Sequence, residues 1–369
     1  MKKLMLSIMA LMAVTASSVF GMYDADSDWV DFLTHGNQLR ARVNQFGFTL
    51  GNGTIKGTFG FKGNNIIFNS NPEYPNASEH GRFQFNPTVS AGLGYTSEAI
   101  SAGVGYSFTY NDKYLSTHTP VLMLNFLNNN LRIVVPVSVA MGNKDPHSST
   151  TKNYKYTGIS TDTHIRYYTG LESFSQLRLY VKYGMNQTEY EMESVKHKES
   201  ASSLGIDFRA YFGANVDNLA LSPFIKVTYD TSLGAKGKMG STSYSIKASD
   251  RTSLYTPQSG QEASYERETY RLRVLPALGM TASSDIVSIY VEPSLGYEVY
   301  DDGQKGSKLK HGLAWNAYGE LYVTPLPNLE WYVEAEIQGA STPVTSGNPQ
   351  TFGFNSSTGI TWYLPSLQE

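Results

Sequence analysis

The sequence predicts an all-β protein, a transmembrane antiparallel β-barrel, from long alternating strands, a rhythm of short and long connections, and an export signal. Residues 83–95 alternate apolar with small or polar side chains, and the same pattern returns over residues 100–110. A period of two is typical of a strand with one apolar face. Each run exceeds the ~5 to 6 residues of a soluble strand and matches the ~9 to 11 that cross a bilayer at a tilt. The apolar residues occupy every second position, and this set, the apolar parity, is therefore expected to face lipid.

The first residues predict a secretory signal peptide. Two lysines precede an apolar run over residues 4–14, and small residues follow as far as Gly21. This order is that of an n-region, an h-region and a cleavage site, which assigns residues 1–21 to the signal. A membrane anchor is the alternative, but the apolar run is shorter than a spanning helix. Residues 22–369 are then expected to form a single outer-membrane β-barrel domain.

The composition agrees with a membrane barrel and excludes other classes of protein. The chain has 26 Tyr and 33 Gly, and tyrosine favours the boundary between lipid and water. Cysteine is absent, which excludes disulfide frameworks, a lipidated cysteine and thiolate chemistry. A formal net charge of −3 gives no reason to expect nucleic acid as a partner.

Residues 22–50 are predicted to form an N-terminal segment that begins with a short helix. Asp28 or the serine before it would cap this helix, and Trp29, Phe32 and Leu33 would form its apolar face. An apolar face of this kind needs a surface on which to dock.

The same segment resembles a known family. The residues that carry the resemblance are Asp28-Trp29-Val30-Asp31-Phe32-Leu33-Thr34-His35-Gly36-Asn37-Gln38-Leu39-Arg40-Ala41-Arg42, Phe46-Gly47-Phe48, Gly51-Asn52 and Thr54-Ile55-Lys56-Gly57-Thr58-Phe59-Gly60-Phe61. Over residues 28–61 the chain resembles the variable surface proteins of spirochaete outer membranes; elsewhere it matches them in signal, length and strand pattern. The resemblance implies an abundant, surface-exposed outer-membrane protein that varies antigenically, and it brings no catalytic residues.

Short and long connections alternate along the rest of the chain. The expected strands are 54–61, 83–95, 100–110, 119–127, 131–141, 157–168, 177–188, 202–212, 219–229, 268–280, 288–300, 312–323, 330–337 and 351–363. In outer-membrane barrels the short turns face the periplasm, and the long loops face outward. Both ends of the chain at the periplasm require an even number, so we expect about fourteen strands, in a range of about 12 to 16, over residues 54–363. Residues 39–50 are a further candidate strand, which this parity assigns to the N-terminal segment.

With the apolar parity outward, charged residues of successive strands point into the lumen, basic ones first and acidic ones on the next three strands. The predicted pore-lining residues are Arg132, Arg166, Arg178, Lys182, Arg209, Lys226, Arg271, Arg273, Glu292, Glu298, Glu320, Glu334 and Glu336. Charged walls of low dielectric focus an electric field across a pore and sort solutes by charge. The alternative is that a wet lumen holds solvated charges in no functional order. A register slip of one residue would invert every assignment.

The hairpin over residues 121–141 is apolar on its expected inward parity as well. The residues on this parity are Leu122, Leu124, Val134, Pro136 and Ala140. Apolar surface exposed to water costs about 25 cal/mol per Å², so a cover is expected. We hypothesise that Trp29, Phe32 and Leu33 provide it as a plug; an inward-folded loop or a subunit contact in a homo-oligomer is the rival.

Catalytic and metal chemistry find no support in the pattern. The chain has 7 His, none paired at metal-ligand spacing on one element, and no constellation of nucleophile and base stands out. We expect no enzyme, metal or cofactor, with a barrel enzyme as the weakest alternative.

The expected function is a passive, porin-like diffusion channel for small hydrophilic solutes in the bacterial outer membrane. The alternative is a non-conducting variable surface antigen or adhesin that displays long extracellular loops, above all 142–156 and 230–267. Expected partners are outer-membrane lipid, the outer-membrane assembly machinery, and host molecules or antibodies at the loops.

Overall fold

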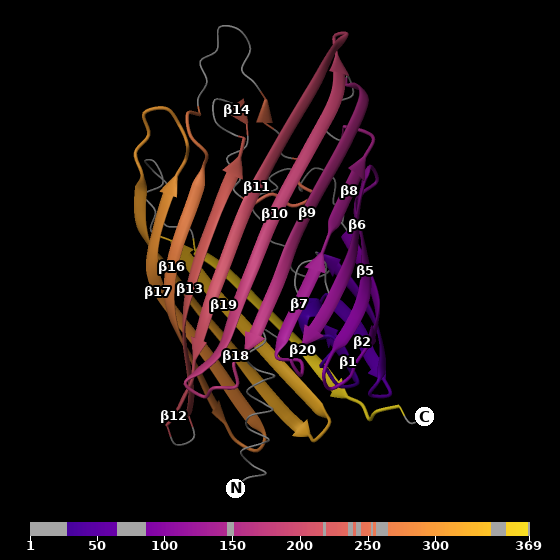
Figure 1. Ribbon diagram of the computed structural model, residues 1–369, viewed down its shortest axis with the longest axis vertical. Helices are drawn as coiled ribbons and strands as arrows, with labels where there is room; N and C mark the ends of the chain where they lie inside the picture. The colour runs from indigo at the N-terminus through magenta and orange to yellow at the C-terminus, as the bar shows by residue number, and fades with distance from the viewer. Residues whose placement is uncertain are drawn as a thin grey trace.

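The computed structural model describes residues 28–64, 86–145, 151–216, 219–234, 239–240, 245–251, 254–255, 265–340 and 352–367. Antiparallel pairing runs from strand to strand and closes on itself, because β1 pairs with β2 on one side and with β20 on the other. The strands form a tall barrel, and the C-terminal end of the described chain lies at its lower rim (Figure 1). The predicted all-β antiparallel barrel is confirmed.

One short 3-10 turn and a single sheet make up the described secondary structure. The elements are η1 (Asp28–Asp31), β1 (Gln38–Arg42), β2 (Gln45–Gly51), β3 (Ile55–Asn64), β4 (Asn86–Tyr95), β5 (Ser101–Asp112), β6 (Leu115–Phe126), β7 (Leu131–Pro136), β8 (Ser138–Gly142), β9 (Lys152–Tyr168), β10 (Phe174–Met192), β11 (Val195–Phe212), β12 (Ala214–Val216), β13 (Leu219–Leu233), β14 (Met239–Gly240), β15 (Leu254–Tyr255), β16 (Tyr270–Ser283), β17 (Val287–Asp301), β18 (Lys310–Leu326), β19 (Leu329–Ala340) and β20 (Phe352–Tyr363).

These elements make a barrel wall of sixteen strands. β7 and β8 are two parts of one wall strand, since both pair with β6 and with β9. β12 continues β11 past Gly213, because both pair with β13. β14 and β15 pair with each other within the connection from β13 to β16.

The sixteen strands lie at the upper end of the expected range of 12 to 16, two more than the fourteen expected. The additional strands, β1 and β2, come from residues that the pattern assigned to the N-terminal segment. Residues 39–50 showed strand character but counted as one candidate; they form two short strands, of 5 and 7 residues, joined by a tight turn. Two extra strands preserve the even number, which is why parity could not reveal the error. The predicted N-terminal helix is likewise a single 3-10 turn of 4 residues, and the described residues contain no longer helix.

A second difference concerns the upper rim. Residues 189–201 were expected to form a charged loop, but β10 and β11 pair continuously up to a turn of two residues. Glu193 and Ser194 take left-handed backbone angles, with φ of 52° and 66°. A type I′ turn, which is common in two-residue hairpins, requires a positive φ at both of its central residues. The resulting hairpin rises above the rest of the barrel (Figure 1).

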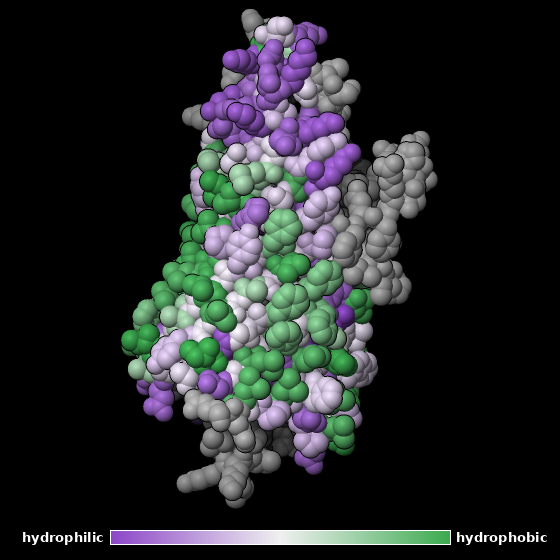
Figure 2. All heavy atoms as spheres, turned by 90° about the vertical axis from the view of Figure 1, so that its right-hand side faces the viewer, coloured by the Kyte–Doolittle hydropathy of each residue, from purple (hydrophilic) through white to green (hydrophobic). Residues whose placement is uncertain are grey.

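The outer face of the wall is apolar. Val104, Leu295 and Phe354 are 60%, 61% and 61% exposed, respectively, and each alternates with residues that point inward. Figure 2 shows hydrophobic side chains over the middle and lower part of one face, and hydrophilic ones at its upper end. Among the described residues, no helix is both long and apolar enough to cross a bilayer.

The assignment of faces can be tested on neighbouring residues of β17. Leu295→Arg should lower the free energy of unfolding by about 2 to 4 kcal/mol, because it places a charge against lipid. Ser294→Arg, on the opposite parity, should cost much less because its side chain enters the wet lumen. Equilibrium unfolding by urea in lipid vesicles measures both. Equal losses would contradict this assignment, and a larger loss for Ser294→Arg would mean that the two faces of β17 are reversed.

Candidate functional site

The inside of the barrel is the candidate site, and its lower part holds the N-terminal turn. Trp29, Phe32 and Leu33 are 1%, 0% and 3% exposed. They pack in one buried cluster with Val30 and three residues of the inner wall, which are Val121, Met123 and Val134. The three predicted plug residues thus lie on the apolar strip of β6 and β7. We call residues 28–35 the plug.

The strip itself differs in part from the expected one. Val134 and Pro136 of β7 face inward as expected, but Leu122 faces lipid and is 45% exposed. Met123 pairs directly with Val134, and directly opposed residues point to the same face of a sheet. The inward residues of β6 are therefore those with odd numbers, so the assignment of Leu122 and Leu124 to the lumen was wrong.

Glycines on β4 and β5 make room for the plug. A Cβ at Gly92 would lie 2.6 Å from Trp29, and one at Gly94 would lie 2.4 Å from Leu33. Gly105 is equally tight, with Trp29 at 2.8 Å. These separations are too short for any side chain, so the inner faces of both strands form a cradle that only glycine allows.

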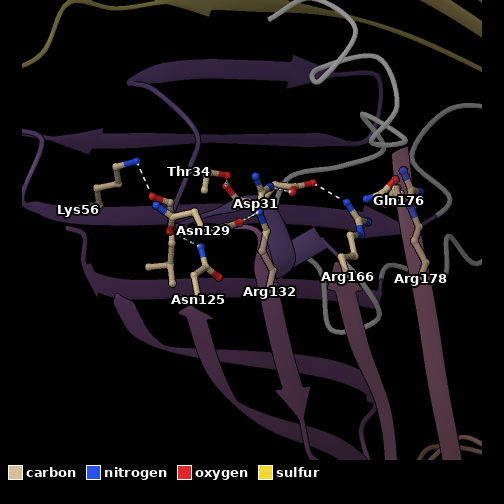
Figure 3. Close-up of polar contacts among 10 residues, drawn as sticks. Asp31, Thr34, Lys56, Asn125, Asn129, Arg132, Arg166, Gln176 and Arg178 are labelled. Atoms are coloured by element: carbon tan, nitrogen blue, oxygen red, sulfur yellow. Dashed lines mark hydrogen bonds and ion pairs between the residues drawn. The ribbon is translucent and has the colours of Figure 1, made fainter. Parts of the chain in front are cut away.

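Ion pairs and hydrogen bonds fix the polar side of the plug (Figure 3). The carboxylate of Asp31 is buried and accepts from Arg132 at 2.5 Å and from Arg166 at 2.9 Å. The ammonium of Lys56 on β3 donates to the backbone carbonyls of Leu33, at 2.8 Å, and His35, at 2.5 Å. Two predicted pore-lining arginines are therefore engaged by the plug.

The plug also shifts the pKa of two of its own groups. Burial by itself would raise the pKa of Asp31, but the charges of Arg166 and Arg132 outweigh it and hold that pKa well below its ordinary value. Burial, followed by the charge of Arg40, lowers the pKa of His35 to about 3. At neutral pH the docked plug therefore carries an ionised Asp31 and a neutral His35.

The thirteen predicted pore-lining residues all lie on wall strands, on the parity opposite to the exposed apolar side chains. On the basic side, carboxylates of the same wall accompany the cations: Lys182 lies 3.5 Å from Asp162, and Arg209 lies 2.7 Å from Asp207. Asp207 also has Lys226 at 3.8 Å, and Asp230 has Arg271 at 3.9 Å. Arg178 donates a hydrogen bond to the side-chain oxygen of Gln176, at 2.9 Å.

The acidic side of the wall is organised by tyrosines as well as by arginines. Glu298 and Glu334 form ion pairs with Arg273 and Arg42. Three other acidic residues accept hydrogen bonds from neutral donors. These contacts are Tyr290 to Glu292, Tyr318 and Tyr322 to Glu320, and Asn316 to Glu336. The basic and acidic arcs meet where Arg273 of β16 contacts Glu298 of β17.

The upper part of the lumen contains an element that the sequence pattern did not reveal. Residues 245–251, which we call the strap, belong to the longest expected outer loop but lie against the inner wall. The amides of Ile246 and Ala248 donate to Ser203 Oγ at 2.8 Å and Ser160 Oγ at 3.0 Å. Tyr156 donates to the carbonyl of Ala248 at 2.7 Å.

The strap crosses several strands at very close range. A Cβ at Gly158 would lie 1.9 Å from the carbonyl oxygen of Ala248, and one at Gly184 would lie 1.8 Å from that of Ile246. Arg251 ends the strap in an ion pair with Asp112 of β5, at 2.9 Å. Part of the loop 230–267 is thus an interior element and not a displayed one. Its sequence signal is limited to Ile246 and Ala248, which alternate with polar residues in a polar loop.

Within the described residues, no group of three His, Asp or Glu side chains is arranged to hold a metal ion. The features of the lumen are therefore a plug, a strap and two charged walls.

Comparisons with known proteins place this barrel in a family. A family model described as Serpulina hyodysenteriae variable surface protein matches residues 2–363. The chain belongs to this family. It is an outer-membrane β-barrel of the variable surface proteins, as the residues around the plug predicted. No curated protein sequence matches it significantly.

Several solved barrels are similar to this variable surface protein. A bacterial polysaccharide outer membrane secretin has 11% identity and a TM-score of 0.48, over 89% of this chain and 98% of that one. The translocator domain of the autotransporter NalP from Neisseria meningitidis has 15% identity and a TM-score of 0.36, over 97% and 95%. OmpT of Vibrio cholerae has 8% identity and a TM-score of 0.35, over 89% and 96%.

The glycine cradle predicts what holds the plug. The chain has no cysteine, so Leu33→Cys with Val134→Cys should give a crosslink that reports docking. Adding Gly92→Val and Gly105→Val should abolish most of this crosslink, because both side chains would collide with Trp29. Gly57→Val, on the lipid face of β3, is the matched control and should leave the yield unchanged. An undiminished yield in the cradle variant would contradict the docking geometry.

The plug should also loosen in acid. The pKa of His35 falls from 6.5 to about 3 on docking, so docking is fully stable above pH ~6.5 and weakens as the pH falls toward ~3. Asp31 adds a further loss only below its ordinary pKa of 3.8, because its folded pKa is depressed. The crosslink should therefore decline between pH 6.5 and 4, and His35→Gln should remove that decline. A decline that persists in His35→Gln would assign it to another group.

Proposed function

We propose that this variable surface protein is a passive, porin-like diffusion channel for small hydrophilic solutes. The observation that carries the proposal is closure by sixteen strands, because barrels of about 16 to 18 strands are wide enough to leave an aqueous channel. Charged side chains on the inner wall stay accessible to water: Lys182 and Lys226 have 41% and 33% of their side chains exposed.

The position of the plug and the strap supports the same function. The plug packs on the inner face from β4 to β7, and the strap follows the wall from β5 to β11. Strands β17 to β19, with the acidic residues, follow about half a circuit later in the order of the barrel. Solutes would therefore pass between a half of the wall covered by these two segments and the acidic half.

The channel should respond to charge changes on the wall. Planar-bilayer recording of the folded protein should show discrete conductance steps. Arg271→Ser with Arg273→Ser should shift the selectivity toward cations, because two positive charges leave the lumen. Lys305→Ser with Lys308→Ser removes the same charge from the connection between β17 and β18, outside the strands, and is the control. An unchanged reversal potential in the variant with both Arg271→Ser and Arg273→Ser would contradict the proposed role of the charged walls in ion selectivity.

A second candidate function is favoured by the hairpin of β10 and β11. These strands have 19 and 18 residues, far more than the ~9 to 11 that cross a bilayer. The excess carries charged residues such as Glu189 and Lys198, which pair with each other at 3.3 Å above the rest of the wall. A barrel that folds but never conducts would support a display scaffold, whose outer hairpin meets host molecules or antibodies.

A further inference from the structure

A cavity of about 340 Å³ lies between the strap and the inner wall of β9, β10 and β11. We call it the chamber. Its volume is at the lower end of the ~300 to 1,000 Å³ of small-molecule sites. Charged residues of three strands and of the strap line it, and they are Asp162, Arg166, Lys182, Asp207, Arg209 and Lys247. The plug meets this lining at Arg166, which forms an ion pair with Asp31.

Positive charge exceeds negative charge around the chamber because its carboxylates are shared. Asp207 forms ion pairs with both Arg209, at 2.7 Å, and Lys226, at 3.8 Å. Asp31 of the plug forms ion pairs with both Arg132, at 2.5 Å, and Arg166, at 2.9 Å.

The third carboxylate, Asp162, follows the same rule. It lies 3.5 Å from Lys182 and 3.2 Å from the Nε2 atom of His164. Of the residues that line the chamber, two carboxylates, Asp162 and Asp207, face three cations of the wall, which are Arg166, Lys182 and Arg209, and the strap adds Lys247. A low-dielectric wall strengthens the resulting field.

We propose that the chamber binds small oxyanions, of the carboxylate or phosphate type. The inference rests on the proposed function in that solutes must reach the lumen. Lys182 is the most accessible of the three wall cations that line the chamber, with 41% of its side chain exposed against 4% for Arg166 and 23% for Arg209, and Lys247 approaches from the strap. Ser160 and Ser203 accept the strap amides through their hydroxyl oxygens, so each keeps its O–H as a donor to an anion.

The strap is what makes this a bounded site. Without it the wall of β9 to β11 would be an open surface, on which water screens each charge. The close approach at Gly158 and Gly184 holds the strap at a fixed height above the wall. An oxyanion in the chamber would meet cations from both sides, which is the arrangement that favours binding over passage of neutral solutes.

Isothermal titration of the detergent-folded protein tests the proposal, with inorganic phosphate and succinate as probes and glucose as the neutral reference. Both anions should bind, and glucose should not. Lys182→Gln and Lys247→Gln should each weaken anion binding about tenfold, because one full charge is removed next to the anion. Lys196→Gln with Lys198→Gln, at the tip of the β10 and β11 hairpin, is the matched control and should leave binding unchanged.

Two results would overturn the proposal: absence of anion binding by the wild-type protein, or binding that neither Lys182→Gln nor Lys247→Gln weakens. Anion binding should also fall with ionic strength, because it is electrostatic. The test is separate from that of the channel. A protein that conducts but binds neither anion refutes the chamber alone, whereas one that binds anions but never conducts refutes the channel alone.

Discussion

The structure depends on one constraint, which is that a chain in lipid must pair every backbone amide and carbonyl within itself. Pairing of β1 with β20 meets this requirement at the last open edge, with Gln38 opposite Tyr363. The segment after the last strand then folds back on the same rim, where the side chain of Asn37 donates to the carbonyls of Gly51 and Pro365. Because closure fixes the number of strands, it also fixes the width of the lumen and the room for everything inside it.

The interior is divided by what each half of the wall has to accommodate. Where the plug and the strap come closest to the wall, glycine and serine residues make room for them, as at Gly94, Gly184 and Ser203. Where no described segment covers the wall, glutamates and tyrosines fill the same positions. Packing therefore explains part of the distribution of small and charged residues, since Arg166, one of the predicted pore-lining residues, pairs with Asp31 of the plug.

Alternation predicted the faces of most long strands because a period of two leaves no other way to bury or expose a strand. It failed for β6, where neighbours such as Leu122 and Met123 are both apolar and so give no alternation. The same reasoning failed for β1, which has too few residues to show a period. It failed for the tip of β10 and β11 because Glu193 and Ser194 lack the Asn-Gly signature of their turn. The position of the strap could not be predicted from the sequence, because it depends on Gly158 and Gly184, which are distant in the chain, and not on any local pattern.

The outer hairpin has a consequence for how a surface can diversify. Main-chain hydrogen bonds join its paired residues, from Met192 opposite Val195 down to the barrel. These bonds are the same whatever side chains the paired residues carry. Between the tip and the membrane, β9 also pairs with β10, as far as Lys152 opposite Glu191, so the raised part is a ribbon of β9, β10 and β11. Successive versions of such a ribbon can present new chemistry while the register stays fixed. Variation at the cell surface is thereby uncoupled from the folding of the part that lies in the lipid.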